Sequence, residues 1–358
     1  MSRPDVRPGR GAPENRTPTR FNLPLREVDG DWLDARGEVD GELPPLRTTV
    51  TMETPRTVIT RNSSPDIGFD RSINAYRGCE HGCIYCFARP THAYHDLSPG
   101  LDFETKLFAK PDAAKLLRAE LAKPGYSPRP IAMGTNTDPY QPIEAIWRIT
   151  RSLIEVLRET KHPFTITTKS DRVVRDIDLI APMAAEGLAS VAISITSLTP
   201  EISRTLEPRA PAGRKRLAAV KALAAAGVPV SVAIAPVIPA VTDHELEHIV
   251  EAAAEAGASG TFFLPVRLPH EVAPLFRAWL EEHFPDRAGK VMSIIQSLRG
   301  GKDNDPNFFT RLQGFGPWAE LLRVRFEAAV RKHGLNREKK RLRTDLFTPP
   351  QGPQLRLF

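Results

Sequence analysis

The chain has 358 residues, of which 41% are hydrophobic and 26% charged, an ordinary composition for a globular protein with a buried core. It contains no run of about 18 apolar residues, so no segment is expected to span a bilayer, and its first residues do not resemble a secretory signal. We therefore expect a cytoplasmic protein. The formal charge of +6 suits a phosphate-bearing partner such as nucleic acid, and equally a solvated basic surface.

Residues 1–62 are rich in Pro, Gly, Arg and Asp and show no sustained hydrophobic periodicity. A segment of this composition buries too little apolar surface to offset the entropy of ordering it. We therefore predict that residues 1–62 form a disordered extension.

Between residues 63 and 269, short apolar runs alternate with longer amphipathic stretches. The apolar runs predict strands and the amphipathic stretches predict helices. The expected strands are 72–78, 130–134, 164–168, 190–196, 228–236 and 261–266, and the expected helices are 113–121, 143–159, 173–185, 213–226 and 244–256. This alternation favours parallel strands with right-handed crossovers. Six units are too few for an eight-stranded barrel and predict an α/β fold, a partial (β/α)6 TIM-like barrel.

Beyond residue 269 the pattern becomes helical. Amphipathic stretches at 272–284 and 317–333 predict a helical C-terminal segment over residues 270–336, packed across the side or mouth of the barrel. Residues 337–358 combine a basic run at 337–343 with Pro and Gln, which predicts a basic and flexible tail.

Three cysteines, Cys79, Cys83 and Cys86, lie within eight residues on the loop expected after the first strand. An odd number of clustered thiols does not suit a disulfide framework and indicates a metal site. With the spacing CxxxCxxC, three thiolates can bind three irons of a cubane cluster and leave the fourth iron open.

The alternative is a zinc knuckle with a fourth ligand from a nearby histidine: His81, His92 or His95. Structural zinc sites more often combine two short clips separated by a longer loop. The spacing therefore favours the iron–sulfur cluster.

The cysteine motif, with an aromatic residue before its last cysteine and its place after the first strand of a partial barrel, resembles the radical S-adenosylmethionine superfamily. This resemblance implies that the cysteines hold a [4Fe–4S] cluster whose open iron binds the methionine moiety of S-adenosylmethionine (SAM). The reduced cluster would cleave SAM to a 5′-deoxyadenosyl radical, which abstracts hydrogen from a substrate. An external electron donor of flavodoxin or ferredoxin type is implied as a partner. Tyr85 matches an adenine-contacting aromatic residue, or is simply a core aromatic residue.

Later motifs follow in order: GTNTDPYQP at 134–142, TTKS at 167–170, ISIT at 193–196, LEP at 206–208, GRKRLAA at 213–219 and AP at 235–236. They are similar to those of the spore photoproduct lyase-related group within the superfamily. The resemblance matches Lys169 to a lysine that pairs with the methionine carboxylate and Ser194 to a serine that hydrogen-bonds the cofactor. It places Thr135 and Asn136 near the amino group of SAM. Alternatively, Lys169 is a solvated lysine at the end of a strand, Ser194 is a small buried residue and Thr135 is a turn former.

The chain departs from that group at the end of the second strand. The lyase carries a hydrogen-donating cysteine there, whereas this chain has Met133-Gly134 and no fourth cysteine. Either another donor such as Tyr140 acts, or the reaction is not thymine-dimer reversal, which we favour. The leading hypothesis is a radical enzyme of unknown substrate, with nucleic acid as one candidate. The alternatives are a small-molecule or peptide substrate, or an iron–sulfur or zinc binding module without radical catalysis.

The C-terminal residues resemble the short motif by which bacterial replication and repair proteins bind the DNA polymerase sliding clamp. Gln354, Leu355, Leu357 and Phe358 would contact the clamp, after a Pro-rich lead that holds them away from the domain. In the alternative, the last apolar residues fold back onto the helical C-terminal segment.

Overall fold

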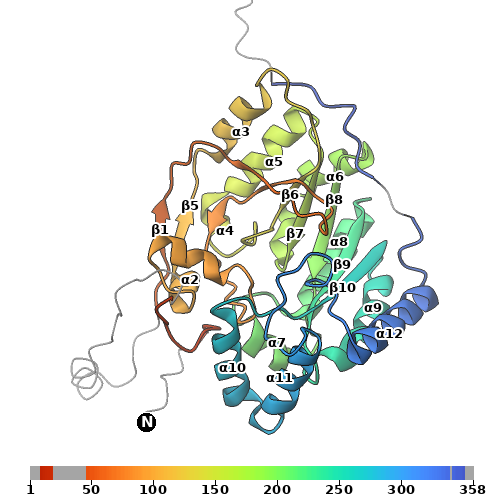
Figure 1. Ribbon diagram of the computed structural model, residues 1–358. Coiled ribbons are helices and arrows are strands. Elements are labelled where there is room, and N and C mark those ends of the chain that lie inside the picture. Colours follow the sequence, from red (N-terminus) through yellow and green to blue (C-terminus); the bar gives the residue numbers. More distant parts are fainter. Residues whose placement is uncertain (1–8, 19–45, 339–340, 351–358) are drawn as a thin grey trace, which may run out of the picture.

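The computed structural model describes residues 9–18, 46–338 and 341–350, and its centre is an open, curved sheet of seven strands (Figure 1). The strand order is β10-β9-β8-β7-β6-β3-β2. The strands are β2 (Ile59–Arg61), β3 (Arg71–Ile73), β6 (Ile131–Met133), β7 (Phe164–Thr168), β8 (Ala189–Ser194), β9 (Val230–Val237) and β10 (Gly260–Pro265). All neighbouring pairs from β3 to β10 are parallel, and β2 is antiparallel to β3. The predicted partial (β/α)6 barrel is confirmed.

A second, three-stranded sheet stands beside the first barrel strand. It has the order β1-β5-β4 and consists of β1 (Thr49–Met52), β4 (Tyr76–Arg77) and β5 (Lys106–Ala109). The single strand expected at 72–78 is therefore divided between two sheets, with β3 in the barrel and β4 in the small sheet. This division turns the chain away from the barrel just before Cys79.

Helices cover the outer face of the barrel, and their apolar faces pack on the strands. They are α3 (Ala113–Leu121), α4 (Glu144–Trp147), α5 (Ile149–Glu159), α6 (Ile177–Ala185), α8 (Gly213–Ala225) and α9 (Leu246–Glu255). The helix expected at 143–159 is broken at Arg148, whose φ of 50° is left-handed. Hydrophobic periodicity continues across such a break because it reports burial rather than backbone dihedrals.

The C-terminal segment is helical, as predicted, and contains α10 (Val272–His283), α11 (Ala288–Ser297) and α12 (Pro317–His333). Helices α10 and α11 share a second apolar core with Ile84 of the cysteine loop, and α12 packs against α9 and β10. Helix α11 and the short α7 (Pro200–Leu206) were not predicted. Within the described ranges, no helix is long and apolar enough to cross a membrane.

The prediction that residues 1–62 are disordered is wrong for the part of that segment that is described. Strands β1 and β2 pair with the folded body, and Ala12 is buried. The N–H groups of Gly11 and Ala12 donate to the Glu104 carboxylate at 2.9 and 2.8 Å. Glu104 is itself buried in an ion pair with Arg89. A buried carboxylate must fill its acceptor sites, and the backbone of residues 11–12 supplies two donors that composition does not reveal.

We expect Gly11→Val to detach this N-terminal segment. A Cβ at Gly11 would lie 1.6 Å from the carbonyl oxygen of Gly82, a contact that no side chain can make. Losing the two hydrogen bonds to Glu104 should lower the free energy of unfolding by about 2 kcal/mol. Trypsin should also cut faster after Arg10 and Arg16.

The matched control is Gly68→Ala, because nothing lies within 4 Å of a Cβ at Gly68. Equal rates of tryptic cleavage in the two variants would show that residues 9–18 do not depend on this close approach.

The predicted flexible tail is also wrong for residues 341–350. The N–H groups of Arg343 and Thr348 donate to Gly187 and Thr160 carbonyl oxygens at 2.9 and 3.0 Å, and the Phe347 ring packs against His162. Residues 339–340, within the basic run, and residues 351–358 lie outside the described residues. The sliding-clamp motif, with Gln354, Leu355, Leu357 and Phe358, therefore stays a prediction.

Candidate active site

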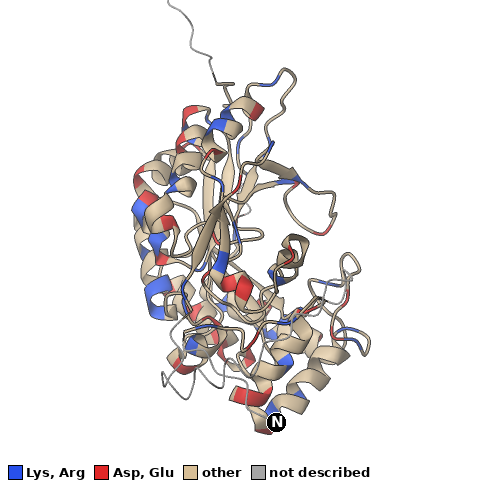
Figure 2. Cartoon of the chain, turned by 90° about the vertical axis from the view of Figure 1, so that its left-hand side faces the viewer, with Lys and Arg blue, Asp and Glu red and all other residues tan. Residues whose placement is uncertain are grey.

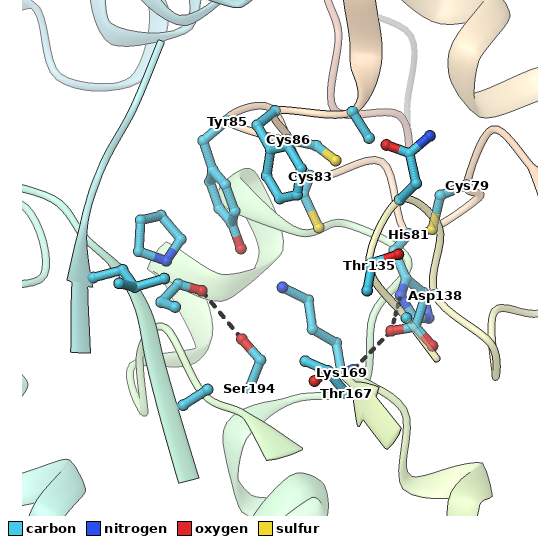
Figure 3. A pocket seen from close by; sticks show the side chains of 18 of the residues that line it. Cys79, His81, Cys83, Tyr85, Cys86, Thr135, Asp138, Thr167, Lys169 and Ser194 are labelled. Atoms are coloured by element: carbon cyan, nitrogen blue, oxygen red, sulfur yellow. Dashed lines mark hydrogen bonds and ion pairs between the residues drawn. The ribbon is translucent and has the colours of Figure 1, made fainter. Parts of the chain in front are cut away.

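The three cysteines lie on a compact loop that begins directly after β4. The Cys79 N–H donates to the Phe103 carbonyl oxygen at 3.0 Å, and the Cys86 N–H to the Cys83 carbonyl oxygen at 3.2 Å. Buried Arg89 donates to the carbonyl oxygens of Gly82 and Cys83 at 3.0 and 2.8 Å. The loop is thereby braced from behind, and its thiols line one pocket (Figure 3).

Burial makes the thiols of Cys79 and Cys83 difficult to ionise in the absence of a cation. It raises the pKa of Cys83 to about 12, with Lys169 opposing the shift, and raises the pKa of Cys79 well above its ordinary value. A metal cluster would replace the thiol protons by iron and remove this cost, since metal ligands are thiolates. Three cysteines on one loop therefore fit a cubane cluster.

The histidines considered for a zinc knuckle have other contacts. His81 Nδ1 lies 3.3 Å from Asp138 Oδ2, His92 Nε2 lies 2.9 Å from the Lys106 carbonyl oxygen, and the His95 ring packs on Phe108. Within the described ranges, no group of three or more His, Cys, Asp or Glu residues is arranged to hold one metal ion. A zinc knuckle needs four donors about one ion.

The other predicted residues come from the carboxyl ends of three adjacent strands. Thr135 and Asn136 follow β6, Lys169 follows β7, and Ser194 ends β8. All four line the same pocket as the cysteines and Tyr85. Parallel strands place these residues together because their carboxyl ends meet at one edge of the barrel.

Asn74, which the sequence did not single out, shapes the loop after β6. Its Oδ1 accepts the Asn136 N–H at 2.9 Å, and its amide donates to Thr135 Oγ1 at 3.2 Å. At Gly134 the φ is 91°, and a Cβ there would lie 1.9 Å from the Thr167 carbonyl oxygen. Only glycine allows this turn to approach β7 so closely.

Asp138 joins the loops after β6 and β7. Its carboxylate accepts the Thr168 hydroxyl at 2.6 Å and the Lys169 N–H at 2.7 Å, and it faces His81. Burial alone would raise the pKa of Asp138, but His81 and these donors lower it to about 2. Asp138 therefore stays ionised and fixes the backbone from which the Lys169 side chain leaves.

Lys169 extends into the space between Cys83 and Ser194 (Figure 3), with its Nζ 5.7 Å from the centre of the Tyr85 ring. Burial lowers the pKa of Lys169, but Cys83 and Glu207 outweigh this effect and raise it, so the ammonium group is charged. In the part of the chain that the structure describes, Nζ makes no hydrogen bond or ion pair. It is therefore available to an anionic ligand.

Sequence reasoning assigned no role to Glu207 and Arg216, although both lie in the motifs after β8. They form an ion pair with both side chains 1% exposed. The Glu207 carboxylate also accepts the hydroxyls of Tyr85 and Thr196, and Arg216 donates to the Ser194 carbonyl oxygen at 2.9 Å. This network holds Tyr85 against the wall of the pocket.

Tyr140 does not suit the role of hydrogen donor. Its hydroxyl donates to Asp176 Oδ2 at 3.0 Å, its side chain is fully buried, and it does not line the pocket. That alternative is not supported by the structure.

Known proteins resemble this chain in sequence and in fold. The family model described as the radical SAM superfamily matches residues 73–253. An uncharacterized protein of Mycobacterium tuberculosis is 35% identical over 269 residues, 75% of either chain. One of Methanocaldococcus jannaschii is 27% identical over 214 residues, 60% of this chain and 76% of the other. A structure of spore photoproduct lyase, complexed with dinucleoside spore photoproduct, has a TM-score of 0.54 and 17% identity over 80% of this chain and 79% of the other. This last likeness shows a shared fold.

Proposed function

This chain belongs to the radical SAM superfamily, and we propose that it is an enzyme that cleaves SAM with a [4Fe–4S] cluster held by Cys79, Cys83 and Cys86. The observation that carries this proposal is that the two buried thiols of Cys79 and Cys83, the half-buried thiol of Cys86 and the ammonium group of Lys169 meet in one pocket. When bound, the reduced cluster supplies the electron that converts SAM to a 5′-deoxyadenosyl radical.

Different residues of the pocket bind different groups of SAM. Lys169 binds the methionine carboxylate, because a carboxylate at a partly buried site needs a positive partner. Thr135 and Asn136 lie near the amino group, Ser194 offers its hydroxyl, and the Tyr85 ring contacts the adenine. A structure of a spore photoproduct lyase mutant, which shares this fold, contains bound AdoMet, which supports the assignment of SAM.

Apolar residues close the far wall of the pocket, namely Ala233, Ala235, Pro236 and Leu264. These side chains exclude water from the place where a reactive species is formed. The proposed reaction also needs an external one-electron donor of flavodoxin or ferredoxin type. Because Met133 is buried in the core where the lyase has its cysteine, we propose a reaction other than thymine-dimer reversal.

The proposal is tested by anaerobic reconstitution with iron and sulfide. The protein should take up about four irons per chain, and addition of dithionite and SAM should produce 5′-deoxyadenosine, measured by chromatography. Stoichiometric zinc without iron uptake would instead favour a zinc binding module. Iron uptake without 5′-deoxyadenosine would favour an iron–sulfur module that lacks radical catalysis.

Lys169→Met should weaken the binding of SAM about thirtyfold, or about 2 kcal/mol, because the methionine carboxylate would lose its positive partner in a partly buried site. Equilibrium dialysis of the reconstituted, unreduced protein measures this change. The iron content should stay at the wild-type value, since Lys169 is not a ligand.

The control is Lys221→Met, which removes an exposed lysine from α8. Equal dissociation constants in the two variants would mean that Lys169 is only a solvated lysine at the end of a strand.

A further inference from the structure

The solvent-facing part of the pocket is built from aromatic and basic side chains. Phe87 follows the last cysteine, Phe262 lies on β10, and they are 49% and 40% exposed. Arg267, just after β10, and Leu312, in the loop before α12, complete this part of the lining. Large apolar rings so exposed at the mouth of a pocket are typical of ligand contacts.

Arg267 pairs with no acidic side chain among the described residues, and Asp66 acts on it only from a longer distance. Its guanidinium lies 5.3 Å from the centre of the Phe87 ring. Across residues 9–18, 46–338 and 341–350 it makes no hydrogen bond or ion pair. A half-buried cation without an anion costs free energy, which a bound anion would recover.

The two nearby arginines are engaged. Arg311 forms two hydrogen bonds to Asp66, at 2.6 and 2.8 Å. Arg299 donates to the carbonyl oxygens of Val266, Thr310 and Arg311 and so fastens the loop before α12 to the end of β10. Arg299 is buried and Arg311 is paired, so of the three arginines it is Arg267 that presents its guanidinium in the pocket lining.

The combination of aromatic ring and guanidinium occurs at this mouth and again in the loop before α12, outside the lining of the pocket. Arg267 lies over Phe87, and Arg311 lies over Phe308 at 4.7 Å from the ring centre. We call the three pocket-lining residues Phe87, Phe262 and Arg267 the Phe–Arg rim. Exposed aromatic faces interleaved with arginine bind unpaired nucleotides, since every base has a face that stacks and every nucleotide has a phosphate.

The outer helices carry charges of both signs (Figure 2). Along the outer helices, Lys and Arg alternate with Asp and Glu. Many of these charges are paired, as in Arg118–Glu159 and Arg151–Asp178. A positive charge that is already paired with a carboxylate attracts a polyanion less than the guanidinium of Arg267 does.

We propose that the substrate of this site is a nucleotide, free or within a single strand, whose phosphate binds Arg267 and whose base stacks on the Phe–Arg rim. This inference rests on the proposed radical function, because it names what that function acts on. Arg267 positions the nucleotide at the mouth, so that the sugar or the base lies toward the cysteines.

The test measures binding to reconstituted holoprotein with SAM present at saturation, so that the adenine site is filled. The probes are a fluorescein-labelled single strand of about ten nucleotides, followed by polarisation, and unlabelled pyrimidine 5′-monophosphates as competitors. Arg267→Gln should weaken binding about tenfold and reduce the slope of log K against log salt by about 0.7. Arg267→Lys should keep the slope. Phe262→Ala should weaken binding of the labelled strand about tenfold, whereas Phe262→Trp should bind it as tightly as the wild type.

The matched control is Arg204→Gln, which removes an exposed arginine from α7. Competition by the monophosphates supports a free nucleotide as the source, and binding of the strand alone supports a polymer. Absence of binding by both, or equal affinities in Arg267→Gln and Arg204→Gln, overturns the inference. Wild-type protein that binds nucleotides but forms no 5′-deoxyadenosine contradicts the proposed function and leaves the nucleotide site standing.

Discussion

Replacing Cys83 by alanine should abolish cluster assembly and reduce the formation of 5′-deoxyadenosine to background. Cys83 is buried on the loop that begins after β4, and its thiol lies in the pocket with Lys169 and Tyr85. With one thiolate removed, two cysteines remain for a cubane that the loop can bind only through three. Iron and sulfide analysis after anaerobic reconstitution measures the loss, and chromatography measures the product.

The folded protein should survive this substitution. The pKa of Cys83 is raised to about 12, so without a metal the side chain is a small neutral group whose loss removes little buried surface. The free energy of unfolding of the metal-free protein should fall by no more than about 1 kcal/mol. Ile84→Val, a packing change in the same loop, is the control and should keep the iron. Full iron content and cleavage in Cys83→Ala would show that Cys83 is not a ligand.

Arg216→Met should lower the free energy of unfolding by about 3–5 kcal/mol, because it leaves the Glu207 carboxylate buried without its cation. Both side chains are 1% exposed, so water cannot replace the lost partner. Urea denaturation at neutral pH measures the change. Adding Glu207→Gln to the variant should recover more than half of the loss, since the amide is uncharged and still accepts a hydrogen bond from Tyr85.

The pH dependence of stability should follow from the same pair. Burial would raise the pKa of Glu207, but Arg216 and Lys169 lower it to about 2, below the value of 4.5 for a free glutamate. The contribution of Glu207 is therefore present above pH 4.5 and is lost as the pH falls toward 2. In Arg216→Met, the free energy of unfolding should therefore change less as the pH falls from 4.5 toward 2.

An exposed ion pair provides the control for these measurements. Arg204 and Glu201 on α7 are about 70% exposed, so Arg204→Met should change the free energy of unfolding by no more than about 0.5 kcal/mol. If Arg204→Met and Arg216→Met lowered the free energy of unfolding by similar amounts, burial would not be the reason for the large effect expected at Arg216. Full additivity of the Arg216 and Glu207 substitutions would show that the two side chains are not coupled.

The sequence by itself determined the helices and strands that depend only on residues close to one another along the chain. The apolar runs at 164–168 and 228–236 and the amphipathic stretches at 113–121 and 213–226 predicted β7, β9, α3 and α8 closely, because side-chain periodicity is a local property. The three cysteines lie close together in sequence, so the candidate metal site could also be predicted. Thr135, Lys169 and Ser194 were identified through a family resemblance and the rule that parallel strands end at one edge.

Only the tertiary structure decided which distant side chains hold these residues in place and which other residues join them in the pocket. Asn74 reaches Asn136 across 62 positions, Glu104 reaches Gly11 across 93, and Glu207 reaches Tyr85 across 122. A buried polar group must find partners wherever the fold brings them, and no local pattern records which distant group that is. The same reason explains why the described N-terminal residues are ordered despite their composition, and why the open charge of Arg267 beside Phe87 became visible only after folding.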